Sequence, residues 1–349
     1  MPLFSDRIIA WQRLHGRHDL PWQNTRDPYA VWVSEIMLQQ TQVAAVIPYY
    51  QRFMARFPDV AALAAAQEDA VLQQWSGLGY YSRARNLHAA AIMVMDEFGG
   101  SFPERPDDIV RLPGIGRSTA AAIAAFCFDH RGAILDGNVK RVLSRCYGIE
   151  GWPGQPTIEK ALWELAESLL PHTDIAGYCQ GLMDLGASLC SRSKPACGLC
   201  PLQTECVAQR DNLTAILPTP KPRKALPERT TTMLLLIEGN QILLEKRPPT
   251  GIWGGLWSLP EVDGDADARL AARERFGLET SMKPSLPRLM HAFTHFRLHI
   301  TPQPLQVTAR LPQVRESRAV WLDLEDAIGA ALPAPVRRLL AQLQPDQEA

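Results

Sequence analysis

The pattern of apolar and polar positions changes near residue 210 and divides the chain into two parts. Before that point alanine and leucine recur with helical period, most clearly in ALAAAQEDAVLQQW, RARNLHAAAIMVMDEF, GRSTAAAIAAFCF and IEKALWELAESLL. Asp27 followed by Pro28 predicts a helix start, with the carboxylate as N-cap and proline at the first helical position. We therefore expect residues 1–210 to form a mainly α-helical domain.

From residue 230 onward the pattern is that of strands and short helices. TTTMLLLIEGNQILLEKR predicts two strands around a Glu-Gly-Asn turn, and the strict alternation of HAFTHFRLHI predicts one strand. ADARLAARERFGL and PAPVRRLLAQL predict short helices. Residues 211–229 contain four prolines, which exclude a helix or a central strand, so this stretch is predicted to be a linker. We expect residues 230–349 to form an α+β domain.

Length and charge set outer limits on the interpretation. At 349 residues the chain is long enough for two domains, each with its own core. No apolar run is long enough to cross a bilayer, and the N-terminal stretch lacks the core of a signal peptide. The formal net charge is −1, so any site for nucleic acid must be a local basic face. These features predict a cytoplasmic protein without a membrane partner.

Four cysteines follow the spacing C-x6-C-x2-C-x5-C, at Cys190, Cys197, Cys200 and Cys206. Zinc sites generally use two short cysteine pairs, whereas this run has a single short pair and suits a cubane [4Fe–4S] cluster better. The alternatives are a zinc ion or four buried or disulfide-bonded thiols, although the odd total of seven cysteines argues against disulfides. The remaining cysteines lie in apolar helical sequence and are predicted to be core residues: Cys127, Cys146 and Cys179.

The segment from Leu112 to Gly116, LPGIG, connects two helical stretches. Its glycines permit a tight hairpin whose backbone N–H groups point outward beside a helix N-terminus, an arrangement that suits a phosphate. Such a hairpin would hold a DNA backbone without reading its sequence. An ordinary helix–helix turn is the alternative.

Two carboxylates are candidates for chemistry. Asp136 precedes a predicted helix, where unpaired N–H groups and the helix dipole would keep it ionised. Glu35 has apolar helix neighbours, which should raise its pKa: Val31, Trp32, Ile36 and Leu38. Taken alone, the spacing favours a plain helix cap at Asp136 and an exposed helix position at Glu35. Together they would form an acid-plus-stabiliser pair, as in glycoside hydrolases.

Longer motifs carry a resemblance to a known family. LPGIGRSTAAAI, LDGNVKRV and the cysteine loop resemble the base-excision DNA glycosylase superfamily typified by endonuclease III. WVSEIMLQQTQV, GLGYYSRARNL and QGLMDLGASLC are similar to the adenine DNA glycosylase (MutY) family, which removes adenine mispaired with 8-oxoguanine or guanine. The resemblance implies a helix-hairpin-helix fold, a [4Fe–4S] cofactor, and a monomer that acts on double-stranded DNA of the nucleoid.

The resemblance also implies roles for individual residues. Glu35 would protonate adenine N7, Asp136 would stabilise the sugar cation, and Asn138 would orient water or a phosphate. The implied adenine-pocket residues are Trp22, Leu38, Gln180 and Ser118. The implied DNA contacts are Gln40 and Tyr80 as wedges, Leu112, Gly114 and Gly116 in the hairpin, and Arg83, Arg85, Lys140 and Arg141 at phosphates.

Ser118 bears on the type of reaction. Bifunctional relatives place a lysine at this point, whose amine attacks the sugar and nicks the strand, whereas serine cannot form a Schiff base. The resemblance therefore implies a monofunctional glycosylase. Two other classes stay open: a glycosylase/lyase for oxidised pyrimidines, expected to have lysine at 118 and no second domain, and a non-enzymatic iron–sulfur regulator, which needs no Glu35/Asp136 pair.

The second part resembles Nudix proteins through GIWGGLWSLPE and the short helix after it. A Nudix hydrolase needs R-E-x-x-E-E-x-G to hold Mg²⁺, and the helix here, AARERFG, lacks those glutamates. The resemblance thus implies a non-catalytic reader of 8-oxoguanine. The matching contact segment is Phe293, Thr294 and His295, with threonine where the family commonly has serine. An amphipathic strand without this role is the alternative.

Overall fold

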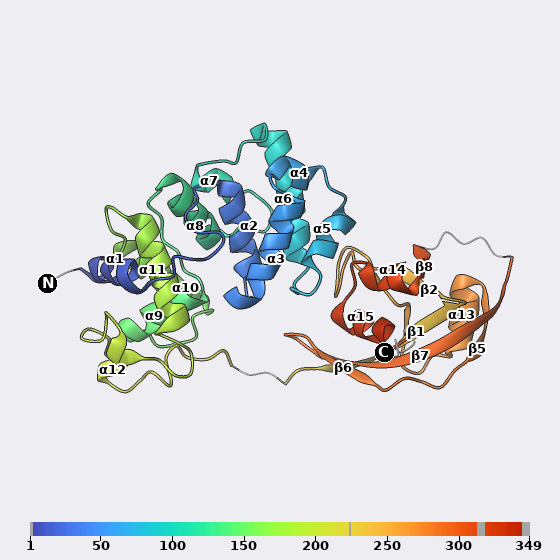
Figure 1. The fold of residues 1–349 in the computed structure, drawn as a ribbon. Coiled ribbons are helices and arrows are strands. Elements are labelled where there is room, and N and C mark those ends of the chain that lie inside the picture. The colour runs from blue at the N-terminus through green and yellow to red at the C-terminus, as the bar shows by residue number, and fades with distance from the viewer. Residues whose placement is uncertain (1–2, 223–224, 313–317, 344–349) are drawn as a thin grey trace, which may run out of the picture. The chain divides into compact units, whose positions relative to one another are not determined.

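The computed structural model describes residues 3–222, 225–312 and 318–343. They form two compact units, Met1–Ala65 with Asn86–Arg223, and Ala66–Arg85 with Lys224–Ala349. The first is helical and the second is α+β, which confirms the predicted fold class (Figure 1). Among the described residues, no helix combines the length and apolar composition that crossing a bilayer requires. Arg223 and Lys224 of the predicted linker lie outside the described residues.

The helices of the first unit are α1 (Phe4–His15), α2 (Pro28–Leu38), α3 (Val43–Arg56), α4 (Val60–Ala64), α7 (Pro106–Ile109), α8 (Arg117–Phe128), α9 (Gly137–Cys146), α10 (Pro156–Ser168), α11 (Ile175–Ser188), the 3-10 helix η1 (Cys197–Leu199) and α12 (Val207–Arg210). Helix α6 (Ser82–Phe98) begins in the second unit and continues into the first. Asp27 caps α2 as predicted, because its Oδ1 accepts from the backbone N–H of Tyr29 at 3.0 Å and Pro28 opens the helix.

One core joins α1, α8, α9, α10 and α11 of the first unit. Gly181 lets α11 approach α1 closely, since a Cβ there would stand 2.7 Å from Cγ2 of Ile8. Gly186 does the same against α9, where a Cβ would stand 2.6 Å from the Cβ of Asn138. The contact at Gly186 fixes α11 against the start of α9, where Asp136 lies.

The second unit contains strands β1 (Glu228–Glu238), β2 (Gln241–Lys246), β3 (Trp257–Ser258), β4 (Glu261–Val262), β5 (Leu278–Met282), β6 (Leu289–Ala292), β7 (Arg297–Arg310) and β8 (Ala319–Asp323), and helices α5 (Glu68–Trp75), α13 (Ala268–Phe276), α14 (Leu324–Gly329) and α15 (Ala334–Ala341). The sheet runs β3-β2-β1-β7-β5, with β4 beside β1, β6 beside β7 and β8 beside β2. Strands β1 and β7 are parallel, and α13 packs its alanines on the apolar face of the sheet (Figure 1). The predicted β1–β2 hairpin is confirmed, with Ile237 opposite Ile242.

The prediction of a single strand for HAFTHFRLHI is wrong. Strand β6 ends at Ala292 and β7 starts at Arg297, and the two pair antiparallel with those residues opposite each other. Residues 293–296 form the turn, closed by a bond from the N–H of Phe293 to the carbonyl of Phe296 at 2.9 Å, with their rings stacked at 4.6 Å. Alternating apolar residues do not distinguish one strand from a tight hairpin, so the sequence pattern alone could not reveal this turn.

Residues Ala66–Arg85, predicted to belong to the helical domain, are grouped by the structure with the second unit. The contacts responsible are polar and far apart in sequence. Asp69 pairs with Lys246 and accepts from the indole N–H of Trp257 at 3.3 Å. Ser76 and Tyr81 both donate to the carbonyl of Leu332 at 3.3 Å. Helical periodicity carries no information about such partners, which explains the difference.

Candidate active site

Helix α2 buries most of its surface and presents Glu35 to a cavity. Trp32, Val33 and Met37 are fully buried around it. Burial and, to a smaller extent, the nearby carboxylate of Asp136 together raise the pKa of Glu35 from 4.5 to about 7. The sequence-based expectation of a proton-carrying glutamate is thereby supported by two physical causes, of which desolvation is the larger.

Asp136 caps α9, and its Oδ1 accepts from the backbone N–H of Val139 at 2.8 Å. We expected this position to keep the carboxylate ionised. The structure adds an opposing effect: burial raises the pKa of Asp136, while hydrogen bonds from the backbone N–H groups of Val139 and Asn138 lower it by less. The helix N-terminus therefore offsets part of the cost of burying a charge, and does not remove it.

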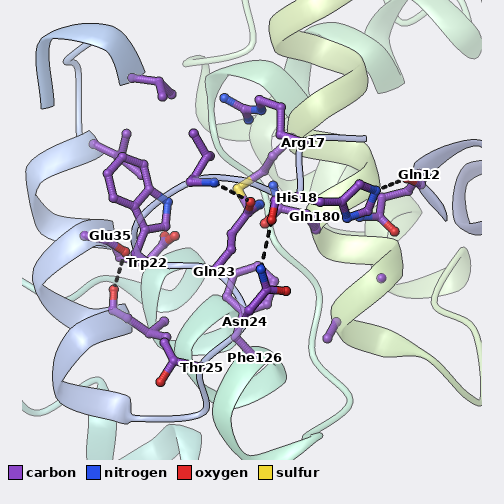
Figure 2. A pocket seen from close by; sticks show the side chains of 18 of the residues that line it. Gln12, Arg17, His18, Trp22, Gln23, Asn24, Thr25, Glu35, Phe126 and Gln180 are labelled. Carbon is purple, nitrogen blue, oxygen red and sulfur yellow. Dashed lines mark hydrogen bonds between the residues drawn. The ribbon is translucent and has the colours of Figure 1, made fainter. Parts of the chain in front are cut away.

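Two neighbouring cavities bring together the residues of the first unit that were predicted to be catalytic or to form the adenine pocket. The Asp136 cavity, of about 330 Å³, is lined by Glu35, Ser118, Asp136 and Asn138. The Trp22 cavity, of about 430 Å³, is lined by Trp22, Gln180 and again Glu35 (Figure 2). Leu38 lines both cavities. Ser118, which was predicted to line the adenine pocket with Trp22 and Gln180, lines the Asp136 cavity instead.

Three hydrogen bonds, one to Ser118 and two from Arg141, hold residues of the Asp136 cavity in place. The Oγ of Ser118 accepts from the backbone N–H of Leu135 at 2.9 Å, which fixes the chain immediately before Asp136. The guanidinium of Arg141 donates from Nη2 to Oδ1 of Asn138 at 2.8 Å, and from Nε to the carbonyl of Cys190 at 2.7 Å. The hydroxyl of Ser118 is therefore engaged by the backbone before Asp136, and Arg141 connects Asn138 to Cys190, the first residue of the cysteine loop.

The sequence pattern did not reveal an ion pair at the Trp22 cavity, between the partly exposed Arg17, which lines the cavity, and the buried Asp184. Arg17 pairs with Asp184 at 2.6 Å, and Asp184 also accepts from the side-chain amide of Gln180. The available signal was a lone aspartate in the apolar helix GLMDLGASL, the same kind of signal that singled out Glu35.

The LPGIG segment forms the predicted helix-hairpin-helix turn between α7 and α8. Leu112 is buried, and its N–H donates to the carbonyl of Ile109 at 3.1 Å. Gly114 has φ +81°, and a Cβ there would stand 2.8 Å from the Cβ of Asn86, so a larger residue would be strained twice over. Gly116 is the N-cap of α8 and provides no side-chain cap, leaving the first turn without a side-chain acceptor of its own.

The cations expected at phosphates bind the protein itself. Arg83 is only 8 % exposed, donates to the carbonyls of Leu78 and Gly79, and has its pKa lowered to about 10 by burial. Arg85 donates to the carbonyl of Gly254, Lys140 pairs with Glu159, and Arg141 makes the bonds given above. Arginine and lysine in a helix look alike whether they face DNA or a carbonyl, so sequence could not separate these cases. Arg83 stabilises the loop that carries Tyr80.

The second unit gathers the residues predicted to meet the base opposite adenine. A cavity of about 790 Å³ is lined by Tyr80, Trp253, Phe293, Thr294 and His295. Tyr80 is 45 % exposed with φ +48°, a conformation that a bulky residue seldom adopts without a reason. Thr294 and His295 are exposed in the turn between β6 and β7. Gln40, in the first unit, is also exposed with positive φ, at the end of α2.

The Nudix metal-binding pattern is broken at two of its three glutamates. Counting back from Gly277, Arg275 and Ala271 occupy two of these positions, whereas Glu274 keeps the third, so the expectation that all are missing is wrong there. Arg275 donates to the carboxylate of Glu245 at 2.7 Å, and Arg247 pairs with Glu261 at 2.5 Å. Two carboxylates that could have met a cation are thus neutralised by guanidinium groups.

The four predicted ligand cysteines line one small cavity with Arg145. The buried guanidinium of Arg145 donates to Sγ of Cys190 at 3.4 Å and to the carbonyls of Ser191, Arg192, Thr214 and Leu217. Thiolate donors around a shared space, with an N–H pointing at one sulfur, fit a four-cysteine group. Within the described ranges, no three His, Cys, Asp or Glu side chains are placed to hold a single metal ion. Cys127, Cys146 and Cys179 are buried, as predicted.

Comparisons with known proteins place the chain in a family. Its residues 33–168 match the HhH-GPD superfamily of base excision DNA repair proteins, and residues 232–342 match the NUDIX domain. It is 38 % identical to the adenine DNA glycosylase of Buchnera aphidicola (Acyrthosiphon pisum, strain APS), over 97 % of each chain. The chain belongs to the adenine DNA glycosylase family. The adenine DNA glycosylase of Mus musculus is 33 % identical, over 96 % of this chain and 77 % of the mouse protein.

As a member of this family, the protein is a base-excision enzyme, a hydrolase that acts on N-glycosyl bonds. Solved structures resemble its helical part. A thermostable thymine-DNA glycosylase gives a TM-score of 0.55 at 31 % identity, covering 60 % of this chain and 95 % of that one. Endonuclease III in a non-covalent DNA complex gives 0.52 at 20 % identity, covering 60 % and 94 %, a likeness of fold.

Proposed function

We propose that this protein removes adenine paired with 8-oxoguanine or guanine and leaves the DNA strand intact at an abasic site. The observation that carries the proposal is Glu35, which lines both the Trp22 cavity and the Asp136 cavity. A base in the first cavity and its sugar in the second would have the N-glycosidic bond beside both carboxyl groups. Adenine must be extruded from the duplex to reach this position, since base atoms in a stack cannot be surrounded.

The chemistry follows from the two carboxyl environments. Glu35, with a pKa near 7, gives its proton to N7 of adenine, so that the base leaves with the electron pair of the glycosidic bond. Positive charge then develops on the sugar, and the carboxylate of Asp136 stabilises it. Water, oriented by Asn138, adds to the sugar carbon and gives its proton to the carboxylate that Glu35 has become, which restores the acid. Ser118 supplies no amine for attack on the sugar, so the backbone is left uncut.

We assign recognition of the opposite base to the second unit. Its cavity contains exposed Tyr80, which can stack on a base, and the hydroxyl of Thr294. The arginine–glutamate pairs at the former Nudix metal position support a reading role without hydrolysis. Gln40 is assigned to the vacated stack, and the hairpin around Gly114 to the DNA backbone. We expect the enzyme to act as a monomer on cytoplasmic nucleoid DNA.

Duplexes with one defined pair test the proposal directly. Adenine opposite 8-oxoguanine and opposite guanine should be released, whereas adenine opposite thymine should stay. The product strand should remain whole until hot alkali is added, and borohydride should trap little enzyme–DNA adduct, because no lysine stands at position 118. Strand cleavage without alkali, or efficient trapping, would contradict the monofunctional assignment.

Thr294→Ala tests the reading role of the second unit. We expect the preference for 8-oxoguanine over guanine to fall by about 5- to 150-fold, the worth of one hydrogen bond of 1–3 kcal/mol, with little change in activity on guanine:adenine pairs. Paired single-turnover rates measure this ratio. Thr308→Ala, which removes an exposed hydroxyl from β7, the strand that follows the turn, is the matched control and should leave the ratio unchanged.

The four cysteines are assigned to a [4Fe–4S] cluster, held by Cys190, Cys197, Cys200 and Cys206. When bound, the cluster supplies a rigid core for its loop, which displays the exposed cations Arg192 and Lys194.

Purified protein should contain about four irons per chain. Cys197→Ser should lower iron content and DNA affinity, while Cys127→Ala, at a buried core cysteine, should keep the iron. Iron and sulfide analysis with a DNA-binding titration checks both results, and stoichiometric zinc in the wild type would overturn the assignment.

A further inference from the structure

Asp184 is a buried carboxylate one helical turn after Gln180 on α11, and only 1 % of it is exposed. Its Oδ1 accepts a hydrogen bond from Nε of Arg17 at 2.6 Å, and its Oδ2 accepts one from the backbone N–H of Arg17 at 2.9 Å. Oδ1 also accepts from Nε2 of Gln180 at 2.8 Å. Asp184 thus joins the guanidinium of Arg17 to the amide of Gln180. Arg17 and Gln180 both line the Trp22 cavity (Figure 2).

This arrangement determines which end of the Gln180 amide is free. The NH₂ and C=O ends have nearly the same shape, so packing alone cannot choose between them. A carboxylate paired with arginine only accepts hydrogen bonds, and it would repel a carbonyl oxygen placed against it. The NH₂ end of Gln180 must therefore face Asp184, which leaves the carbonyl oxygen as the end available to a ligand in the cavity.

We propose that Asp184 is a positioning residue that makes the Trp22 cavity select a purine with an amino group at C6. Held by Asp184, the carbonyl oxygen of Gln180 accepts from the amino group of adenine. Hypoxanthine carries an oxygen at C6, which would place two acceptors against each other without a hydrogen between them. The inference rests on the proposed function, because it takes the Trp22 cavity as the place of the extruded base.

The test compares release of adenine and hypoxanthine, each opposite guanine, by the same enzyme preparation in single turnover. The ratio of the two rates does not depend on the fraction of folded protein, so a loss of stability does not affect it. Asp184→Ala should lower the adenine preference by roughly 5- to 150-fold, since Gln180 can then turn either end to the base. Asp174→Ala is the matched control, because Asp174 is another α11 aspartate paired with an arginine, Arg13, outside the cavity.

Two further variants separate the possible failures. Arg17→Met combined with Asp184→Leu removes the whole ion pair without leaving a buried charge, so it keeps the test open if Asp184→Ala does not fold. Gln180→Met should abolish the preference for adenine over hypoxanthine. Adding Asp184→Ala to Gln180→Met should then leave the ratio of the two rates unchanged, because Asp184 acts only through Gln180.

An unchanged ratio in both Asp184 variants, with the ratio lost in Gln180→Met, would overturn the positioning role alone. An unchanged ratio in Gln180→Met would overturn the base pocket as well. A ratio that falls in the Asp184 variants and in Gln180→Met, but not in Asp174→Ala, supports the inference.

Discussion

Glu35→Gln is expected to slow adenine release by about 10²–10⁴-fold while leaving binding to lesion duplex intact. Glutamine keeps the size of the side chain and loses the proton that adenine must receive. Single-turnover excision and a duplex-binding titration measure the two effects. Glu97→Gln, at an exposed glutamate paired with Arg111, is the control and should behave as wild type. Near-normal excision by Glu35→Gln would remove Glu35 from the mechanism.

The same variant should change two pH profiles. Because burial raises the pKa of Glu35 to about 7, wild-type excision should fall as pH rises through 7, and this limb should disappear in Glu35→Gln. The folded protein also holds this proton more tightly than the unfolded chain between about pH 4.5 and 7. The free energy of unfolding of wild type should therefore decrease across that range, and the variant should lack this contribution. Above pH 7 the variant should be at least as stable, as thermal unfolding can show.

Asp136→Asn is expected to reduce adenine release by about 10²–10³-fold or more, because it removes the negative charge beside the developing sugar cation. Asparagine is as good an N-cap as aspartate, so α9 should remain capped and the melting temperature should change little. Single-turnover excision and thermal unfolding check the two statements.

Asp174→Asn provides the matched control for that variant. Asp174 caps α11 by accepting from the backbone N–H of Gly177, as Asp136 caps α9 by accepting from that of Val139. Both variants lose a charge at a helix N-terminus, yet only Asp136 lies in the cavity with Glu35. Equal activity of the two variants would reduce Asp136 to a structural cap.

The sequence by itself determined the features that depend on adjacent residues. Asp27 and Pro28 predicted the start of α2, and the two glycines of LPGIG predicted the hairpin before α8, because caps and turns involve only a few neighbouring residues. Glu35 could be singled out because its helix neighbours are apolar. The spacing of the four cysteines predicted that they share one site, because they lie close together in the sequence. The catalytic roles of Glu35 and Asp136 came from the family resemblance, and they stay proposals here.

Only the tertiary structure decided which partners the polar side chains have. It turned the predicted strand around Phe293 into a hairpin, placed Arg83 and Arg141 on backbone carbonyls, and paired Asp184 with Arg17. A helical position gives a charged residue a direction but not a partner, and the partner depends on where distant segments return. A buried charge needs such a partner, because leaving it unpaired would lower the free energy of unfolding by roughly several kcal/mol. For this reason the polar contacts around the site, unlike the helices that carry them, could not be read from the sequence.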